Sequence, residues 1–131
     1  MQRAGQNRAK AHDPDAPVGE SEPLVAALRA AAEPLRLSVL RLLERDAFAV
    51  QELCRMLDVS QPALSHHLKL LAAAGLVAAH RDGTSTFYRR ALLDAEHPAQ
   101  PTVAALLSTL DARPLPERAR DAVCWLFSPY L

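Results

Sequence analysis

The chain has 131 residues, of which half are hydrophobic and only 5% are aromatic. This length fits one domain with tails, and a core of Leu, Val and Ala favours helices. No apolar run reaches the roughly 18 residues of a membrane span, and the N-terminus lacks the apolar core of a signal peptide. We therefore expect a cytoplasmic protein with no membrane partner. The net charge is zero, from 15 basic and 15 acidic side chains, so the chain as a whole has no strong attraction to a polyanion.

Residues 1–20 are polar, rich in Pro and Gly, and almost without large apolar side chains, which predicts a disordered tail. Arg3, Arg8 and Lys10 make this tail basic at its tip. Helical signals begin at Ser21, a predicted N-cap followed by Pro23 in the first turn.

Two helices are predicted next, because apolar residues recur at spacings of three and four. The apolar face of the first comprises Leu24, Val25, Leu28, Ala31 and Ala32. Pro34 ends that helix and begins the second. The buried stripe of the second comprises Leu35, Val39, Leu40, Leu42 and Leu43.

A short helix over Val50–Leu57, a turn over residues 58–60 and a longer helix from Gln61 to about Ala73 predict a helix-turn-helix. Ser60 is a good N-cap for the longer helix, and Gly75 is its expected C′ residue in a left-handed conformation.

After Gly75 the pattern changes from helical to strand-like. We predict strands over residues 76–80 and 85–90, joined by a tight turn at Asp82-Gly83. This hairpin is the wing of a winged helix-turn-helix. We expect Phe87 to pack inward, whereas Tyr88 is either a phosphate contact or a structural residue of the strand.

Pro98 and Pro101 bracket a predicted linker, and a helix follows over residues 102–112. Its apolar face comprises Val103, Leu106, Leu107 and Leu110. A last helix is predicted from Glu117 to about Phe127. The chain is thus predicted to be mainly α, with a disordered tail (1–20), a winged helix-turn-helix domain for DNA binding and dimerisation (21–112) and a C-terminal helical extension (113–131).

The helix from Gln61 to Ala73 has two distinct faces. Leu64, Leu68 and Leu71 recur at i, i+4 and i+7, which predicts the buried face. The opposite face is a polar stripe, a name used here for four residues: Gln61, Ser65, His66 and Lys69. Short polar side chains of this kind are suited to hydrogen bonding with base edges in the major groove. His67 falls on the other side, and we expect it to be partly buried near the core.

The N-terminal end of such a helix lies deepest in the groove, so base contacts are expected there and Lys69 is placed to contact phosphate. The wing is expected to approach the backbone or the minor groove, where Arg is favoured. The candidate DNA-binding residues are Ser60, Gln61, Pro62, Ser65, His66, Lys69, Arg81, Thr84, Ser85 and Arg89.

Charge is distributed in agreement with this interpretation. Between residues 60 and 90, four basic residues (Lys69, Arg81, Arg89 and Arg90) accompany one acidic residue, Asp82. Residues 91–131 carry three arginines and five acidic residues. The basic excess therefore falls on the proposed reading surface.

Three segments resemble the ArsR/SmtB family of regulators: Glu33 to Leu40, Glu52-Leu53-Cys54, and the run from Val59 through Ser65-His66-His67-Leu68-Lys69 to Val77. The resemblance covers about residues 33–90. It implies a homodimeric transcriptional repressor that binds an operator with dyad symmetry and is released by an effector. It also implies dimerisation through the first and last helices.

Members of this family often sense metals, so the resemblance suggests two ligand patterns. In the arsenic-sensing pattern, Cys54 matches the first thiol, but Met56 stands where the second thiol is expected. The zinc-sensing pattern begins at Asp94, Glu96 and His97, but no further His follows. Both sites are therefore expected to be incomplete. Cys54 and Cys124 remain weak candidates for a thiol pair that oxidises or binds a soft metal or metalloid; an organic inducer, or none, is equally open.

Two other classes of function fit the sequence less well. A winged helix also serves as a protein-interaction module without DNA, but such a module does not need the polar stripe. An enzyme is not expected, because the sequence has no Gly-rich phosphate loop, paired carboxylates or nucleophile motif.

Overall fold

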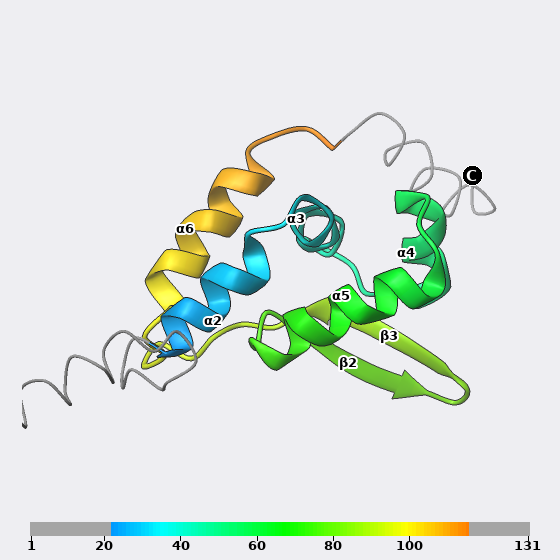
Figure 1. Ribbon diagram of the computed structural model, residues 1–131, viewed down its shortest axis with the longest axis horizontal. Helices are drawn as coiled ribbons and strands as arrows, with labels where there is room; N and C mark the ends of the chain where they lie inside the picture. Colours follow the sequence, from blue (N-terminus) through cyan, green and yellow to red (C-terminus); the bar gives the residue numbers. More distant parts are fainter. Residues whose placement is uncertain (1–21, 116–131) are drawn as a thin grey trace, which may run out of the picture.

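The computed structural model describes residues 22–115, which form five helices and a small antiparallel sheet (Figure 1). The prediction of a mainly α winged helix-turn-helix is confirmed. The elements are α2 (Glu22–Ala31), α3 (Pro34–Leu42), β1 (Phe48–Ala49), α4 (Val50–Leu57), α5 (Gln61–Ala73), β2 (Val77–Asp82), β3 (Ser85–Arg90) and α6 (Gln100–Asp111). The predicted tail, the N-cap Ser21 and the helix over residues 117–127 lie outside the described residues.

Helices α2 and α3 meet at Glu33 and Pro34, as the proline predicts. The Glu33 carboxylate caps α3 by accepting a hydrogen bond from the backbone N–H of Arg36 at 2.8 Å. The buried face of α2 consists of alanines: Ala27, Ala30 and Ala31. Val25 and Leu28 were predicted to lie on the buried face, but they are 37% and 47% exposed. Small alanines allow α2 to approach the core closely, and Leu24 packs against that core, whereas Val25 and Leu28 are exposed.

The helix-turn-helix has the predicted bounds at α4 and α5. Local capping explains this agreement. The Ser60 hydroxyl accepts from the backbone N–H of Ala63 at 3.4 Å at the start of α5. At its end, Gly75 has φ 78°, and its N–H donates to Ala72 O at 3.0 Å while that of Leu76 donates to Leu71 O at 3.0 Å. These two bonds form a Schellman motif, which a left-handed glycine permits.

The sheet has three strands in the order β1-β3-β2 rather than the two predicted. The additional strand, β1, pairs Phe48 with Tyr88 and Ala49 with Phe87. At the wing tip Asp82 pairs with Ser85, which leaves Gly83 and Thr84 as a two-residue turn. Gly83 has φ 62°, and a glycine at the first position of such a turn fits type II′.

This register corrects the expected orientation of two aromatic residues. Directly paired residues lie on the same face of a sheet, so Tyr88 shares a face with Phe48, which is 3% exposed and belongs to the core. Tyr88 is half-buried and packs against that core. Phe87 is half-buried on the opposite face, so the prediction that Phe87 packs inward is wrong.

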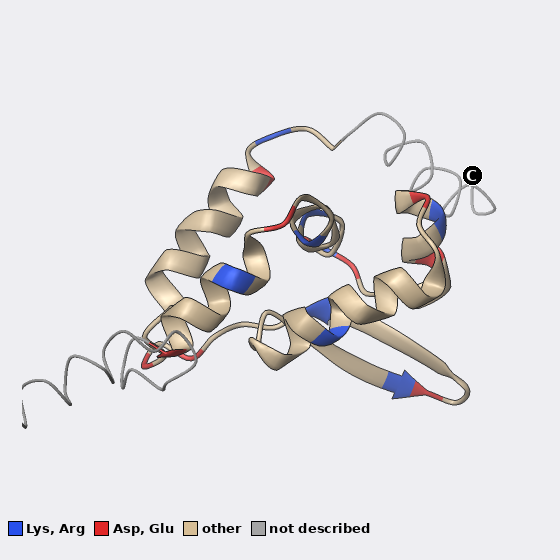
Figure 2. Ribbon diagram, viewed as in Figure 1, with Lys and Arg blue, Asp and Glu red and all other residues tan. Residues whose placement is uncertain are grey.

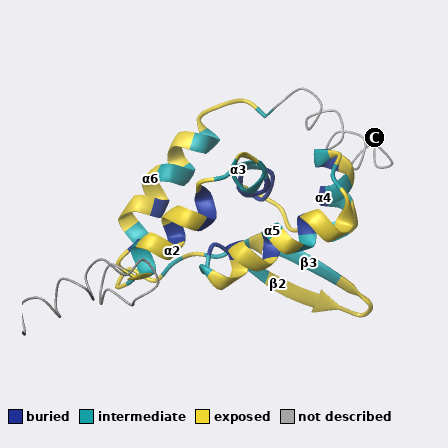
Figure 3. Ribbon diagram, viewed as in Figure 1, coloured by how far each residue is buried: buried dark blue, intermediate teal, exposed yellow. Residues whose placement is uncertain are grey.

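The core lies where the helices meet one face of the sheet, and buried positions concentrate there (Figure 3). The seven largest fully buried side chains are Val39, Leu40, Leu53, Met56, Leu64, Leu68 and Leu71. They come from α3, α4 and α5, so the helix-turn-helix is built on the centre of the core. Within residues 22–115, none of the helices is long and apolar enough to cross a membrane.

Helix α6 begins at Gln100, two residues before the predicted start, because Pro101 is accommodated in its first turn. An ion pair joins the end of this helix to the wing. The Arg90 guanidinium donates to both oxygens of Asp111, at 2.6 and 2.8 Å, and to Leu40 O at 2.6 Å. This arginine therefore connects β3, α3 and α6.

Candidate nucleic-acid interface

The two faces of α5 differ in exposure as the sequence predicts. Leu64, Leu68 and Leu71 are fully buried. In the polar stripe Gln61, His66 and Lys69 are exposed and Ser65 is half-buried. The buried leucines fix the rotation of α5 about its axis, and this rotation presents the polar stripe to solvent.

The start of α5 combines a structural role with an exposed surface. The hydroxyl oxygen of Ser60 accepts the N–H of Ala63, so this residue begins the helix. Pro62 lies in the first turn, where its missing N–H leaves no bond unmade. Both residues are exposed. They therefore belong to the candidate site as part of the N-terminal end of α5, the end expected to enter the major groove.

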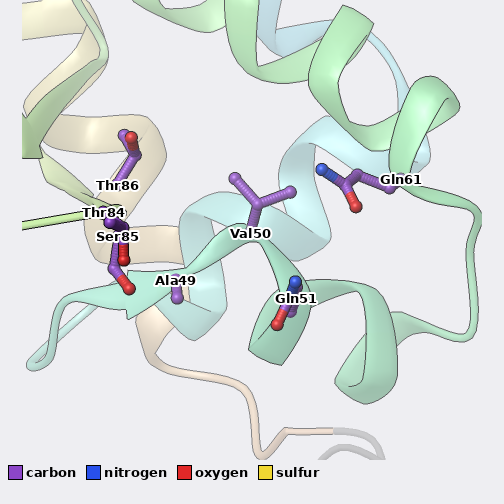
Figure 4. Close-up of a pocket in the computed structure, with 7 residues that line it drawn as sticks. All are labelled: Ala49, Val50, Gln51, Gln61, Thr84, Ser85 and Thr86. Carbon is purple, nitrogen blue, oxygen red and sulfur yellow. The ribbon is translucent and has the colours of Figure 1, made fainter.

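A hollow of about 210 Å³ joins this end of α5 to the wing. It is lined by Ala49, Val50, Gln51, Gln61, Thr84, Ser85 and Thr86. In Figure 4, Gln61 and the wing residues lie on opposite sides of Val50. The structure thus brings together three of the predicted site residues, Gln61, Thr84 and Ser85.

The lining also includes two residues that the sequence analysis missed, Gln51 and Thr86. Their amide and hydroxyl groups match those of Gln61 and Ser85, and such groups donate hydrogen bonds to phosphate oxygens. Their positions in the sequence do not indicate a DNA contact, because Gln51 lies in the first turn of α4 and Thr86 lies within β3.

The wing presents Arg81, Thr84, Ser85 and Arg89 to solvent. Arg89 donates to Arg90 O at 3.3 Å and keeps the rest of its guanidinium exposed. Tyr88, by contrast, packs against the core. Of the two interpretations offered for Tyr88, the structure therefore favours the structural one.

Arg90 does not belong to the basic surface, although its place in the sequence predicts it there. Its side chain is 12% exposed and its charge is matched by Asp111. The exposed basic residues of this region are then Lys69 on α5 and Arg81 and Arg89 on the wing. Figure 2 shows basic positions on α5 and on the wing, with an acidic position near the wing tip.

His67 is half-buried, as predicted, but its surroundings are polar as well as apolar. Its Nδ1 lies 3.0 Å from Nη1 of Arg36 and 3.9 Å from Oε2 of Glu33. The pKa of Glu33 is lowered, chiefly by the hydrogen bond from the Arg36 N–H and then by that from the Leu35 N–H. Partial burial of the carboxyl opposes this shift.

The metal-binding and thiol hypotheses gain no support from the described residues. Cys54 is half-buried, and desolvation raises the pKa of its thiol. Met56 is 2% exposed, and His97 uses Nδ1 to accept from the N–H of Ala99 at 3.1 Å. Between residues 22 and 115 no three His, Cys, Asp or Glu side chains come together as a metal site. Cys124 lies outside this range.

Comparisons with known proteins agree with this geometry. The family model for bacterial regulatory proteins of the arsR family matches residues 33–79. SmtB of Mycobacterium tuberculosis, named an HTH-type transcriptional repressor, is 44% identical over 64 residues, and this match spans about half of each chain (49% of this one and 47% of SmtB). The solved structure of HlyU from Vibrio cholerae matches 71% of this chain and 97% of its own, with a TM-score of 0.58 and 30% identity.

A longer match is found with KmtR of Mycobacterium tuberculosis, named an HTH-type transcriptional regulator. It is 35% identical over 100 residues, which cover 76% of this chain and 75% of KmtR. Because this match extends well beyond the helix-turn-helix, the resemblance seen in the motifs holds for most of the domain. The chain belongs to the ArsR family of bacterial regulatory proteins.

Proposed function

We propose that the chain is a sequence-specific DNA-binding transcriptional repressor that acts as a homodimer. The observation that carries this proposal is the polar stripe of α5, held outward by three buried leucines and joined to the wing by a hollow lined with amide and hydroxyl groups. A helix of this kind fits the major groove of B-DNA, where each base pair has a distinct pattern of donors and acceptors.

The parts of the surface have different roles in this proposal. Gln61, Ser65 and His66 read base edges, because they lie in the N-terminal half of α5. Lys69, Arg81 and Arg89 contact the phosphate backbone and position the protein without specifying sequence. Thr84 and Ser85 line the same hollow as Gln61, so a phosphate seated there bonds to the wing beside the base-reading end of α5.

A second copy of the chain is the proposed partner for the exposed apolar residues of α2. Val25 and Leu28 are large, apolar and substantially exposed on α2, a helix that lies away from the wing tip (Figure 1). A symmetric dimer formed through these residues presents two copies of α5 related by a two-fold axis, as an operator with dyad symmetry requires. The repressor names of SmtB and of other relatives support the same function.

Selection of binding sites from a pool of randomised DNA duplexes tests this function. We expect one enriched sequence with dyad symmetry, bound much more tightly than a scrambled duplex of equal length. Affinity for both duplexes is expected to fall as salt rises, because phosphate contacts release counterions. Failure to enrich any sequence would indicate a protein-interaction module instead.

A further inference from the structure

The side chain of Arg36, which lies outside the polar stripe, makes three polar contacts with neighbouring helices. Its Nε donates to Ala30 O at 2.6 Å, its Nη2 to Arg29 O at 3.2 Å, and its Nη1 lies 3.0 Å from Nδ1 of His67. The first two acceptors end α2, and the third belongs to α5. One guanidinium therefore connects three helices: its own α3, α2 and α5.

The contact with Arg36 determines which ring nitrogen of His67 accepts a hydrogen bond and which carries the proton. A guanidinium has only donors and stays protonated in proteins. The close nitrogen of His67 must therefore accept, which requires a lone pair on Nδ1 and places the ring proton of neutral His67 on Nε2. Glu33 lies on the same side, at 3.9 Å from Nδ1, so the Arg36 guanidinium is the donor in contact and the carboxylate is a more distant neighbour.

The contact between Arg36 and His67 matters for the polar stripe because His67 adjoins one of its members. His67 lies directly beside His66, and the two rings meet edge to face with centroids 5.7 Å apart. Leu64 and Leu68 hold the same stretch of helix against the core. These leucines set which face of α5 is buried, and a directional hydrogen bond beside them adds a constraint on the remaining rotation and axial shift of the helix.

We propose that Arg36 and His67 are positioning residues: the hydrogen bond from the guanidinium to Nδ1 locks the rotation and axial position of α5 against α2 and α3. This inference rests on the proposed function, because its consequence is correct placement of the polar stripe in the major groove. Neither residue contacts DNA. Loss of the bond therefore reduces discrimination between operator and random DNA without removing a phosphate contact.

Two amide substitutions of His67 test the bond itself. The side-chain oxygen of Asn occupies nearly the position of Nδ1, whereas the amide of Gln reaches the position of Nε2. His67→Asn keeps an acceptor for Arg36, and His67→Gln displaces it. Gln is the better helix former of the two, so helix propensity and the proposal predict opposite orders. Arg36→Met removes the donor, and Arg29→Met is its control, because Arg29 contributes only its backbone oxygen to the network.

The first measurement is amide hydrogen exchange over residues 61–73 in the protein without DNA. We expect His67→Gln and Arg36→Met to exchange faster than wild type in this segment, while His67→Asn and Arg29→Met stay close to wild type. The second is the ratio of affinities for operator and random duplex, measured well below the unfolding temperature. We expect this ratio to fall about tenfold in His67→Gln, as for loss of one charge-assisted hydrogen bond, with an unchanged salt dependence.

The two measurements separate the possible failures. Equal exchange in His67→Asn and His67→Gln overturns the positioning role, whatever the DNA result, and does so even if Arg36→Met fails to fold. A changed exchange rate in a protein that shows no operator preference supports the bond and refutes the proposed function. A salt dependence that falls in His67→Gln also overturns the inference, because it indicates a direct phosphate contact.

Discussion

The helix-turn-helix of α4 and α5 and the outer helices α2 and α6 relate differently to the core. Buried leucines of α4 and α5 lie at its centre, and the caps of α5 are made within the segment itself. Helix α2 buries only alanines and α6 buries only Val103. Figure 3 shows much of α2 and α6 exposed, although both carry leucines.

This difference separates two uses of apolar residues. In α5 the apolar stripe stabilises the single chain, because every member of it is enclosed by the same chain. In α2 two large apolar side chains, Val25 and Leu28, are exposed on the single chain, which is expected where a partner covers them. The hydrophobic period alone does not distinguish these cases, since both helices show it equally well. Substitutions in α5 should therefore change the stability of the fold, whereas substitutions on the exposed face of α2 should change dimerisation.

The largest effect is expected from Leu68→Ala in α5. Leu68 is completely buried, so the truncation leaves a cavity and should lower the free energy of unfolding by about 3 kcal/mol. Leu70→Ala is the matched control, because Leu70 is on the same helix and 39% exposed; its cost should stay below about 1 kcal/mol. Denaturation in urea measures both. Equal losses would mean that α5 is not anchored by one face.

The next effect is expected on association. Leu28→Glu places a charge on the exposed apolar face of α2 and should weaken dimerisation at least about tenfold, as for a residue near the centre of an interface. Sedimentation equilibrium measures the dissociation constant. Ala26→Glu introduces the same charge on the same helix, about 160° away from Leu28, and should have a much smaller effect. Identical dissociation constants for the two variants would remove α2 from the interface.

A smaller effect is expected on DNA recognition. His66→Ala should reduce discrimination between operator and random duplex by about 1–2 kcal/mol, because a base contact is lost. Lys69→Ala should weaken both complexes about equally and reduce the salt slope by about 1. Fluorescence anisotropy over a salt series separates these outcomes. If Ser65→Ala, His66→Ala and the double variant all keep full operator preference, the polar stripe is not the reading face.

The helix-turn-helix was predictable because its signals are local. Ser60 begins α5, Gly75 ends it, and the leucine spacing orients it, so the bounds and the exposed face follow from a short stretch of chain. The face of α2 was not predictable in this way, because Val25 and Leu28 fit a helical stripe as well as Ala27 and Ala31 do. Only the packing of close-fitting alanines against α3 and α5 decides which side is inside.

The errors in the wing and around it come from partners distant in sequence. Pairing with Phe48 determines that Tyr88, and not Phe87, faces the core. Phe48 lies in β1, a strand too short to show the alternation of apolar and polar residues that predicts a strand. Arg90 resembles Arg89 in sequence, but Asp111 lies 21 residues away and removes Arg90 from the surface. His67 was placed correctly, whereas its contact with Arg36 spans 31 residues. Long-range polar contacts are therefore the part of the site that needed the structure.

The smallest effect is expected at Cys54, which matches the first thiol of the arsenic-sensing pattern. Burial raises the pKa of this thiol, so the thiolate that reacts with oxidants and soft metals is scarcer at neutral pH than in a free cysteine. Cys54→Ser should therefore leave operator affinity within about twofold of wild type, both untreated and after exposure to a thiol oxidant or arsenite. A response of the wild type that is lost in Cys54→Ser would contradict this. It would show that α4 opens enough to expose the thiol, and the helix-turn-helix would then be less self-contained than its caps and buried leucines indicate.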